Sequence, residues 1–556
     1  MNDDKSKMVL PDFIHQYVNP ETFLGEEDAM DEWQDPKKSV KLFLHTNSYE
    51  DFKKDNILYL FGRRGTGKTA IIRMLDYEIN SGKLKPYICS SIIDHERAYN
   101  ELASQLRGSP LVELPQNELV YFLIQKWRWI LTASAMVCIC KTTSEELDCK
   151  QDLHVLQQYL SKHRLYEAKM HDKSPVSRIT EIIGESLSAI DYIPTKLGLA
   201  ITRISDQIYG NDFTNAEDAM INILRKKKGS CIILIDSIEF YNLKDPISRA
   251  VISSLIQAIR ICYSSRLDKM LLAKAAFPAE IYPYLTLVNQ EKVDGRNLFI
   301  LWRYRDLVCL LAKRYYRYLH EGEPEENRQC KFDGYVDSKE YIYKHLAHKV
   351  EADQGIEFDT LAYIIRHTQK KPRQVILLLN IVLTLAKKAG LDNTLISADF
   401  IKKGVHARLD ILVRGVLEIY QNVYENAETI VKRVLNQAPS HFDASQLDKL
   451  IKEVSAIRTS VALEVEDVKR LLIESGSIGV SLGTHLFPDG VRKLMIVAFE
   501  YQVKGLIATS NRAYYALHPM LYQDVMVDLD LNTFVYPVPY ENEESQLIEA
   551  MGIHVA

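Results

Sequence analysis

The sequence is poor in cysteine, and its few cysteines are spread along the chain. Eight cysteines occur among 556 residues, and only Cys138 and Cys140 lie close together. No pair has CxxC spacing, which argues against a zinc ribbon, a thioredoxin-type site and a disulfide scaffold. We interpret the cysteines as small, buried apolar residues of a protein in the reducing cytosol.

No hydrophobic run in the sequence is long enough to cross a membrane. The longest, Trp129–Cys140 and Val375–Ala386, have about twelve residues each, against the ~20 that a bilayer requires. Residues 1–16 are polar and acidic, without the basic region and apolar stretch of a signal peptide. We therefore expect a cytoplasmic protein without a membrane partner.

The sequence also shows no internal repeat, no low-complexity tract, no His/Cys cluster with metal-ligand spacing, and no nuclease or protease motif. Any destructive chemistry linked to this protein is therefore expected in another polypeptide. Hydrophobic residues at 47% and charged residues at 26% are typical of a globular protein and exclude wholesale disorder. The length predicts about three or four domains.

Charge is unevenly distributed along the chain. Residues 1–35 hold ten acidic side chains and two lysines, and residues 524–556 hold seven acidic side chains and no lysine or arginine. Because the whole chain has a net charge of −5, residues 36–523 carry +10. We interpret the acidic ends as solvated tails. The alternative is that they fold over the basic body and compete with an anionic partner.

A phosphate-binding loop is the most specific motif. The apolar run Ile57–Phe61 leads into GRRGTGKT, which fits G-x-x-x-x-G-K-[ST], and then into a helical pattern. Backbone N–H groups of such a loop, together with the helix N-terminus, bind phosphates. Lys68 is predicted to reach the β- and γ-phosphates, and Thr69 to bind Mg²⁺. The predicted ATP-binding residues are Gly62, Arg63, Arg64, Gly65, Thr66, Gly67, Lys68, Thr69 and Ala70.

A second acidic element follows a buried strand. The five apolar residues Cys231–Ile235 predict a strand covered on both faces, and Asp236 stands at its carboxyl end, where ligands of parallel sheets bind. Asp236 is predicted to hold Mg²⁺ through water. Glu239 is a candidate to orient the attacking water, with a solvated loop carboxylate as the alternative, because Ser237 occupies the more usual position of the base.

Two further segments carry candidate nucleotide sensors. Leu271–Phe277 predicts a strand that offers only Lys274, a weak candidate for contact with the γ-phosphate. Leu361–Ala386 predicts two helices broken at Lys371-Pro372, with Arg373 in the first turn of the second helix. Arg373 is a candidate lid residue that senses the γ-phosphate, and the alternative is a solvent-facing arginine in a basic patch.

The GRRGTGKT start, the LIDSIE strand, the segment Ile300–Tyr318 and the KPRQ element together resemble a bacterial P-loop ATPase family. That family lies in the AAA+ and STAND neighbourhood, near the origin-recognition-like ATPases. The resemblance covers roughly residues 45 to 400. It implies an α/β fold with a parallel sheet, a helical lid, ATP and Mg²⁺ as cofactors, and ATP hydrolysis. Arg314 and Arg317 become candidate arginine fingers if the protein forms a ring or filament. The predicted sensor strand Leu271–Phe277 has no clear polar residue at its end, which implies slow hydrolysis.

The C-terminal region predicts three short helices followed by two strands that form a small hairpin, a pattern typical of a winged helix. These segments are Ala427–Leu435, Ala444–Ile457, Val465–Glu474, Leu494–Glu500 and Tyr514–Leu517. The third helix offers only Lys469 and Arg470 beside three acidic residues. We therefore favour protein docking or autoinhibition over DNA contact for this domain and keep both open.

The expected organisation has five parts. They are an acidic N-terminal extension (1–45), a P-loop NTPase core (46–300) with a helical insertion (about 95–228), a helical lid (301–415), a winged-helix-like domain (416–525) and an acidic C-terminal tail (526–556).

The function that these features favour is an ATP-binding and ATP-hydrolysing molecular switch that recruits or assembles a protein partner or effector subunit. Bacterial anti-phage defence is the setting that the resemblance suggests. The alternative is a nucleotide-gated DNA-binding ATPase that resembles replication initiators. A degenerate P-loop with a structural role is a third interpretation. Homo-oligomerisation and nucleic-acid binding stay open at this point.

Overall fold

The computed structural model describes most of the chain. The described residues are 20–26, 28–93, 95–107, 111, 115–143, 147–165, 178, 181, 210–236, 245–264, 269–285, 290–324, 332, 334–391, 395–421, 423–455, 464–502, 514–539 and 541–552. They divide into two units, which we describe separately. The core unit spans residues 33–301, and the terminal unit spans residues 302–556 together with those up to residue 32.

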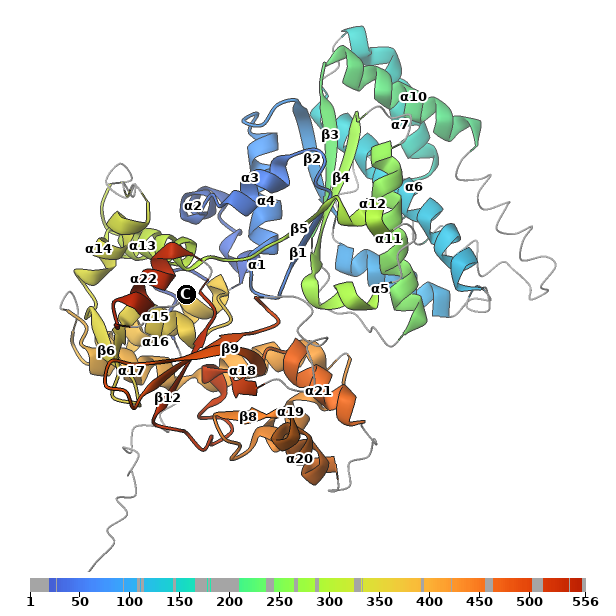
Figure 1. Ribbon diagram of the computed structural model, residues 1–556. Coiled ribbons are helices and arrows are strands. Elements are labelled where there is room, and N and C mark those ends of the chain that lie inside the picture. The colour runs from blue at the N-terminus through green and yellow to red at the C-terminus, as the bar shows by residue number, and fades with distance from the viewer. Residues whose placement is uncertain are drawn as a thin grey trace, which may run out of the picture. The chain divides into compact units, whose positions relative to one another are not determined.

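The core unit is built on a five-stranded parallel sheet with the order β2-β3-β4-β1-β5 (Figure 1). Its strands are β1 Tyr59–Gly62, β2 Tyr87–Ile93, β3 Ser230–Ile235, β4 Leu271–Pro278 and β5 Asn297–Phe299. The predicted α/β fold with a parallel sheet is confirmed. Because all strands run the same way, their carboxyl ends meet at one edge. β4 lies between β1 and β3, so the P-loop strand and the acidic strand are separated by one strand.

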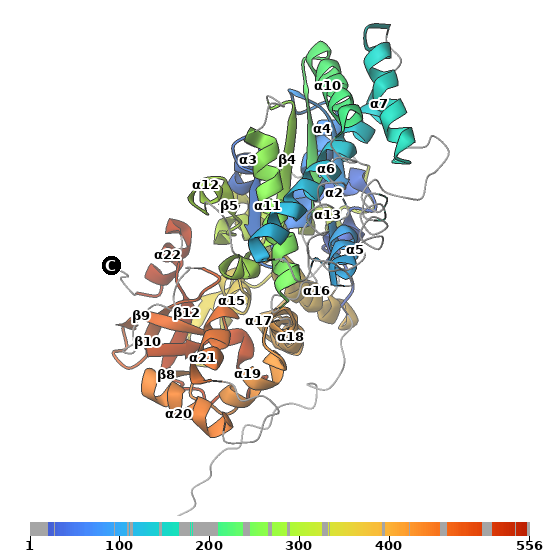
Figure 2. The same cartoon turned by 90° about the vertical axis from the view of Figure 1, so that its right-hand side faces the viewer.

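Helices cover both faces of this sheet, with α4 on one side and α6 and α11 on the other (Figures 1 and 2). The helices of the core unit are α2 Pro36–Leu42, α3 Asn47–Lys53, α4 Lys68–Asn80, α5 His95–Arg107, α6 Gln116–Thr142, α7 Lys150–Lys162, α10 Asn211–Lys226, α11 Pro246–Ser264 and α12 Gln290–Asp294, with 3₁₀ turns at Leu147–Cys149 and Ala279–Tyr284. The indole N–H of Trp127 on α6 donates to the Val251 carbonyl of α11 at 3.1 Å. This double cover explains why β4 is buried along its whole length.

The segment predicted as a helical insertion contributes α5, α6, α7 and α10. The second half of α6 is buried from Trp129 to Cys140, because it packs against both β2 and β3 of the sheet and against α11. The apolar run Trp129–Cys140 is therefore part of a core helix. Among the described residues, none of the helices combines the length and hydropathy that crossing a bilayer would require. Most of residues 166–209, which also belong to the insertion, lie outside the described residues.

The terminal unit begins with helices and ends with a mixed sheet. Its helices are α1 Ala29–Glu32, α13 Tyr304–Leu319, α14 Tyr335–Tyr343, α15 Thr360–Arg366, α16 Pro372–Lys388, α17 Ala398–Ala407, α18 Leu409–Tyr420, α19 Ala427–Leu435, α20 Ala444–Ser455, α21 Val465–Glu474 and α22 Asn542–Glu549, with a 3₁₀ turn at Pro519–Leu521. The predicted break between two lid helices is confirmed, because Lys371 is extended and Pro372 begins α16. A short antiparallel hairpin, β6 Lys349–Glu351 with β7 Glu357–Asp359, interrupts the expected run of helices.

The second sheet has the order β12-β10-β9-β11-β8. Its strands are β8 His441–Asp443, β9 Ile478–Leu486, β10 Lys493–Ala498, β11 Tyr514–Leu517 and β12 Thr533–Pro537. The expected hairpin between the last two predicted strands is wrong, because β9 lies between β10 and β11 and pairs with both. The sequence predicts the wing of that fold at Phe499–Pro519, and residues 503–513 of this segment lie outside the described residues. The winged-helix-like domain stays a prediction.

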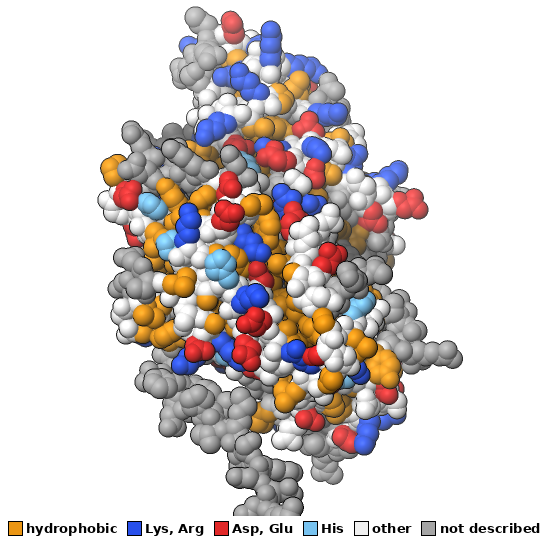
Figure 3. Space-filling model, turned by 60° about the vertical axis from the view of Figure 1, so that its left-hand side comes forward, with side chains coloured by type: hydrophobic (Ala, Val, Ile, Leu, Met, Phe, Trp, Pro, Cys, Tyr) orange, Lys and Arg blue, Asp and Glu red, His pale blue; other side chains and the backbone are white. Residues whose placement is uncertain are grey.

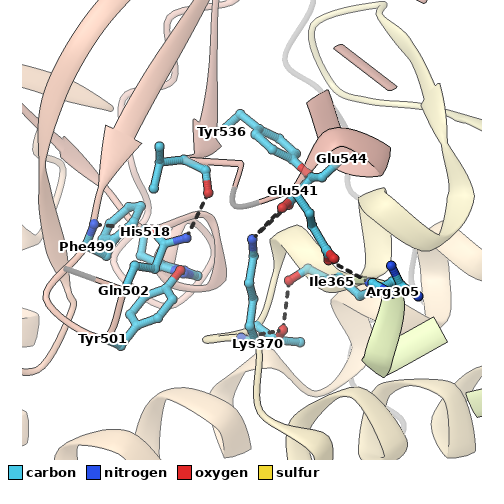
Figure 4. A network of polar contacts seen from close by, with 12 residues as sticks. Arg305, Ile365, Lys370, Phe499, Tyr501, Gln502, His518, Tyr536, Glu541 and Glu544 are labelled. Carbon is cyan, nitrogen blue, oxygen red and sulfur yellow. Dashed lines mark hydrogen bonds and ion pairs between the residues drawn. The ribbon is translucent and has the colours of Figure 1, made fainter. Parts of the chain in front are cut away.

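The acidic ends are not solvated tails where the structure describes them. The Glu544 side chain on α22 is fully buried, and its carboxylate accepts hydrogen bonds from Lys370 Nζ at 2.8 and 2.9 Å and from the Tyr536 hydroxyl at 2.7 Å (Figure 4). At the other end, Glu32 accepts a bidentate pair from Arg314 at 2.7 and 2.9 Å. Charge pairing therefore fixes both acidic segments on the terminal unit.

Candidate nucleotide-binding site

The P-loop connects the end of β1 to the start of α4, as the motif predicts. Gly65 and Gly67 have φ angles of 84° and 88°, in the left-handed region that side chains with a Cβ rarely adopt. Gly67 is the N-cap of α4 and provides no side chain to cap the helix. The first N–H groups of α4 are therefore left for an anionic ligand, which the helix dipole also favours.

Lys68 is buried and curls back over the loop. Its Nζ donates to the Gly62 carbonyl at 3.0 Å and to the Arg63 carbonyl at 3.3 Å. The Thr66 hydroxyl donates to the same Arg63 carbonyl at 2.7 Å. Neutral carbonyl oxygens thus hold the ammonium beside the loop. A phosphate oxygen would accept a stronger hydrogen bond from it, because that oxygen is charged.

Thr69 and Asp236 meet at the carboxyl edge of the sheet. The Thr69 hydroxyl, in the first turn of α4, donates to Asp236 Oδ1 at 3.1 Å, across 167 positions of sequence. Asp236 follows directly on β3. A hydroxyl and a carboxylate are hard oxygen donors of the kind that Mg²⁺ takes from proteins, and they lie close enough for one ion to reach both. The two predicted metal residues are therefore neighbours, and they fit a magnesium ion.

Glu280 is a site residue that the sequence did not reveal. It lies in the turn after β4, and its Oε1 accepts from the Arg64 backbone N–H of the P-loop at 3.3 Å. Its Oε2 is buried and has no hydrogen-bond partner among the described residues. A P-loop amide thus already holds an anionic oxygen, as expected of an amide that binds phosphate. No motif predicts this residue, because it reaches the loop only through the pairing of β1 with β4.

Lys274, the weak sensor candidate, has a structural role. Its side chain is fully buried, and Nζ donates to the carbonyls of Phe52, Lys54 and Ile57 at 2.5, 2.7 and 2.9 Å. Burial lowers the pKa of Lys274 to about 7. Three carbonyls match the three donors of an ammonium, which opposes that shift. Lys274 therefore ties the end of α3 to β4 and is not a γ-phosphate sensor.

The remaining predicted residues are distributed as follows. Ala70 lies in the first turn of α4, beside Thr69. Glu239 lies outside the described residues. Arg373 belongs to the terminal unit, at the start of α16, and its Nη2 donates to Asp28 Oδ2 at 2.6 Å. The arginine-finger candidate Arg314 is buried against Glu32 and the Leu24 carbonyl.

Comparison with known proteins concerns the segment that contains the P-loop. An ORC-CDC6-like family model matches residues 30–83. This segment holds β1, the loop and α4, together with α2, α3 and most of α1. The match supports an origin-recognition-like AAA+ ATPase and, in general terms, nucleotide binding and ATPase activity.

The other comparisons add little. Among solved structures, the Aeropyrum pernix ORC2 protein in its ADPNP–ADP complexes is similar over 91% of this chain and 92% of that chain. The identity is 11% and the TM-score is 0.24, a likeness too slight to assign a role to any residue. No curated protein matches the chain.

Proposed function

We propose that this protein binds and hydrolyses ATP and uses the nucleotide state as a switch. The observation that carries the proposal is the meeting of Thr69 and Asp236 beside a P-loop whose lysine and amides face the same edge of the sheet. Mg²⁺, held by Thr69 and Asp236, would neutralise phosphate charge in such a site. Lys68 would exchange its carbonyl partners for the β- and γ-phosphates, and the loop amides would orient them.

Calorimetric titration with ATP·Mg²⁺ tests nucleotide binding. We expect Lys68→Ala to weaken ATP affinity by about 10- to 100-fold, because a charge-assisted hydrogen bond contributes roughly 1.5–3 kcal/mol. Lys292→Ala, an exposed lysine on α12, is the matched control and should bind as the wild type does. An unchanged affinity in Lys68→Ala would refute the proposal and favour a structural P-loop.

Two carboxylates are candidates to orient the attacking water. Glu239 follows Asp236 in sequence, whereas Glu280 touches the P-loop itself. We expect Glu280→Gln to lower ATP turnover by about 100-fold while ATP still binds, because a positioned general base contributes roughly 10²–10⁴-fold. The comparison with Glu239→Gln under saturating ATP·Mg²⁺ identifies the base. Tighter ATP binding with unchanged turnover in Glu280→Gln would instead make Glu280 only a competitor for the loop amide.

The output that we propose is recruitment or release of a protein partner, coupled to the lid through Arg373. Its guanidinium is held by Asp28, so contact with a γ-phosphate requires exchange of that ion pair. Bacterial anti-phage defence is the setting we propose, with the destructive chemistry in a partner. Plaque counts on cells that carry the wild type or Lys68→Ala test this setting, and equal protection by both would contradict it.

A nucleotide-gated DNA-binding ATPase is the second candidate. It is favoured by the ORC-CDC6-like match and by the net charge of +10 that residues 36–523 carry. Against it, the described residues on the face drawn in Figure 3 intersperse basic and acidic side chains and form no continuous basic patch there. On α21, Lys469 and Arg470 stand beside Glu466 and Asp467. Duplex binding whose log affinity falls steeply with log salt would favour this candidate, and a flat response would exclude it.

A further inference from the structure

Three cysteines that are far apart in sequence meet inside the core unit. Cys89 on β2, Cys138 on α6 and Cys231 on β3 are all buried, and their sulfur atoms lie within 4.8 Å of one another. Cys89 and Cys231 are direct neighbours across the two parallel strands. No spacing rule predicts this cluster, because each cysteine comes from a different element.

The cluster lies on one face of the sheet and away from the P-loop. The next residue, Ser90, points to the opposite face, where its hydroxyl donates to Asp76 Oδ1 of α4 at 2.7 Å. Side chains alternate along a strand, so the Cys89 thiol faces α6. Cys231 stands near the amino end of β3, whereas Asp236 follows its carboxyl end. The cluster is therefore separate from the nucleotide site.

The Cys138 thiol also contacts the backbone of β2, because it donates to the Ser90 carbonyl at 3.4 Å. A metal ion binds the thiolate form of cysteine, so a cation at this cluster would displace thiol protons.

We propose that Cys89, Cys138 and Cys231 form a three-thiolate site for a soft metal ion, Cu⁺ or Zn²⁺. Thiolates select these ions over Mg²⁺. A metal about 2.3 Å from each sulfur needs sulfur separations of roughly 3.8–4.0 Å, so small rotations of the three side chains suffice. Binding releases the thiol protons to solvent and leaves three metal–sulfur bonds without any change of oxidation state.

The surroundings provide an entry path and distinguish the two ions. Cys138 is 6% exposed, and Thr142, one helical turn further along α6, is exposed. No fourth His, Cys, Asp or Glu ligand joins the three sulfurs among the described residues. Cu⁺ accepts three sulfurs alone, whereas Zn²⁺ completes a tetrahedron with water at the Thr142 side. Either ion would tie α6 to β2 and β3.

Equilibrium dialysis of the reduced full-length protein against Zn²⁺ or Cu⁺, followed by metal analysis, tests the site. We expect about one ion per chain for the wild type, with a rise in melting temperature, because an ion that binds the folded state stabilises it. Cys138→Ala and Cys89→Ala should bind at least about tenfold more weakly. Cys140→Ala, buried on the same helix two residues away, is the matched control and should bind as the wild type does.

Two results would overturn the proposal. One is a wild-type protein that binds neither ion at micromolar concentration. The other is equal loss of binding in Cys140→Ala and Cys138→Ala, which would place the ion elsewhere. Should Cys89→Ala fold poorly, Cys138→Ala on α6 and proton release on metal addition to the wild type still decide the question.

Discussion

Single side chains in this protein gain their roles from partners that are distant in sequence. Thr69 and Asp236 lie 3.1 Å apart across 167 positions, and Lys274 binds three carbonyls more than 200 positions before it. In both cases the partner lies on a different element of the core unit. The chemistry of each residue type could be anticipated, but the identity of its partner could not.

A buried histidine makes the stability of the terminal unit depend on pH. Nδ1 of His518 accepts from the Met520 N–H at 3.2 Å, and Nε2 lies 3.0 Å from the Tyr501 hydroxyl, so the ring is neutral. Burial, with the charges of Arg366 and Lys371, lowers the pKa of His518 to about 3. Between this value and about 6.5 the unfolded chain binds the extra proton, so stability falls as pH falls.

We expect His518 to remove about 2–3 kcal/mol of stability between pH 6.5 and pH 4. Urea unfolding at both pH values measures this loss. His518→Gln keeps an acceptor for the Met520 N–H but does not titrate, so it should lose less stability over the same interval. Equal losses in the variant and the wild type would assign the pH dependence to other groups.

At the scale of elements, the connection between α15 and α16 is held from two sides. Lys370 has a φ angle of 51°, in the left-handed region, and its ammonium pairs with buried Glu544 of α22. Arg373, three residues later, pairs with Asp28 of the N-terminal segment. Both acidic ends of the chain thus fix the segment that contains the predicted sensor arginine. A sequence pattern locates this helix break but does not reveal what holds it.

Asp28→Asn should release the predicted sensor. If Arg373 contacts the γ-phosphate, removal of its carboxylate partner should raise ATP affinity or turnover by up to about fivefold, because a half-exposed ion pair contributes roughly 0.2–1 kcal/mol. Steady-state ATPase assays measure the effect. Glu21→Gln, which removes the exposed pair with Lys387, is the control and should have no effect. Lower turnover in Asp28→Asn, or the same gain in the control, would contradict the sensor role of Arg373.

At the scale of the whole molecule, the described acidic ends of the chain pair with basic side chains. The net charge of −5 is the sum of +10 over residues 36–523 and the negative charge of the two ends. The described part of each end contacts basic side chains of the terminal unit. Glu32 neutralises Arg314, which was a candidate finger for a neighbouring subunit. Total charge therefore says little about the partner of this protein.

The mass of the full-length protein in solution tests assembly. Because the guanidinium of Arg314 already binds Glu32 of its own chain, we expect it to act as no arginine finger on a neighbouring subunit. Any ATP·Mg²⁺-dependent oligomer should then survive Arg314→Lys but not Lys68→Ala, as measured by light scattering with and without nucleotide. An oligomer that binds ATP yet loses hydrolysis only in Arg314→Lys would restore the finger role.

Local patterns by themselves determined the strands β1, β3 and β4 of the parallel sheet, the P-loop, Asp236 and the break before Pro372. Each depends on residues adjacent in the chain: apolar runs, glycines with positive φ, and a proline without an N–H. The sequence also indicated an origin-recognition-like ATPase, which the family match to residues 30–83 supports.

Only the tertiary structure decided which distant residues meet. It placed Glu280 on the P-loop, Lys274 under α3, β9 between β10 and β11, and the three cysteine thiols within 4.8 Å of one another. It also showed that acidic residues at both ends of the chain, expected in solvated tails, pair with buried basic side chains. These contacts depend on strand order and helix packing, which bring together residues that no local spacing relates.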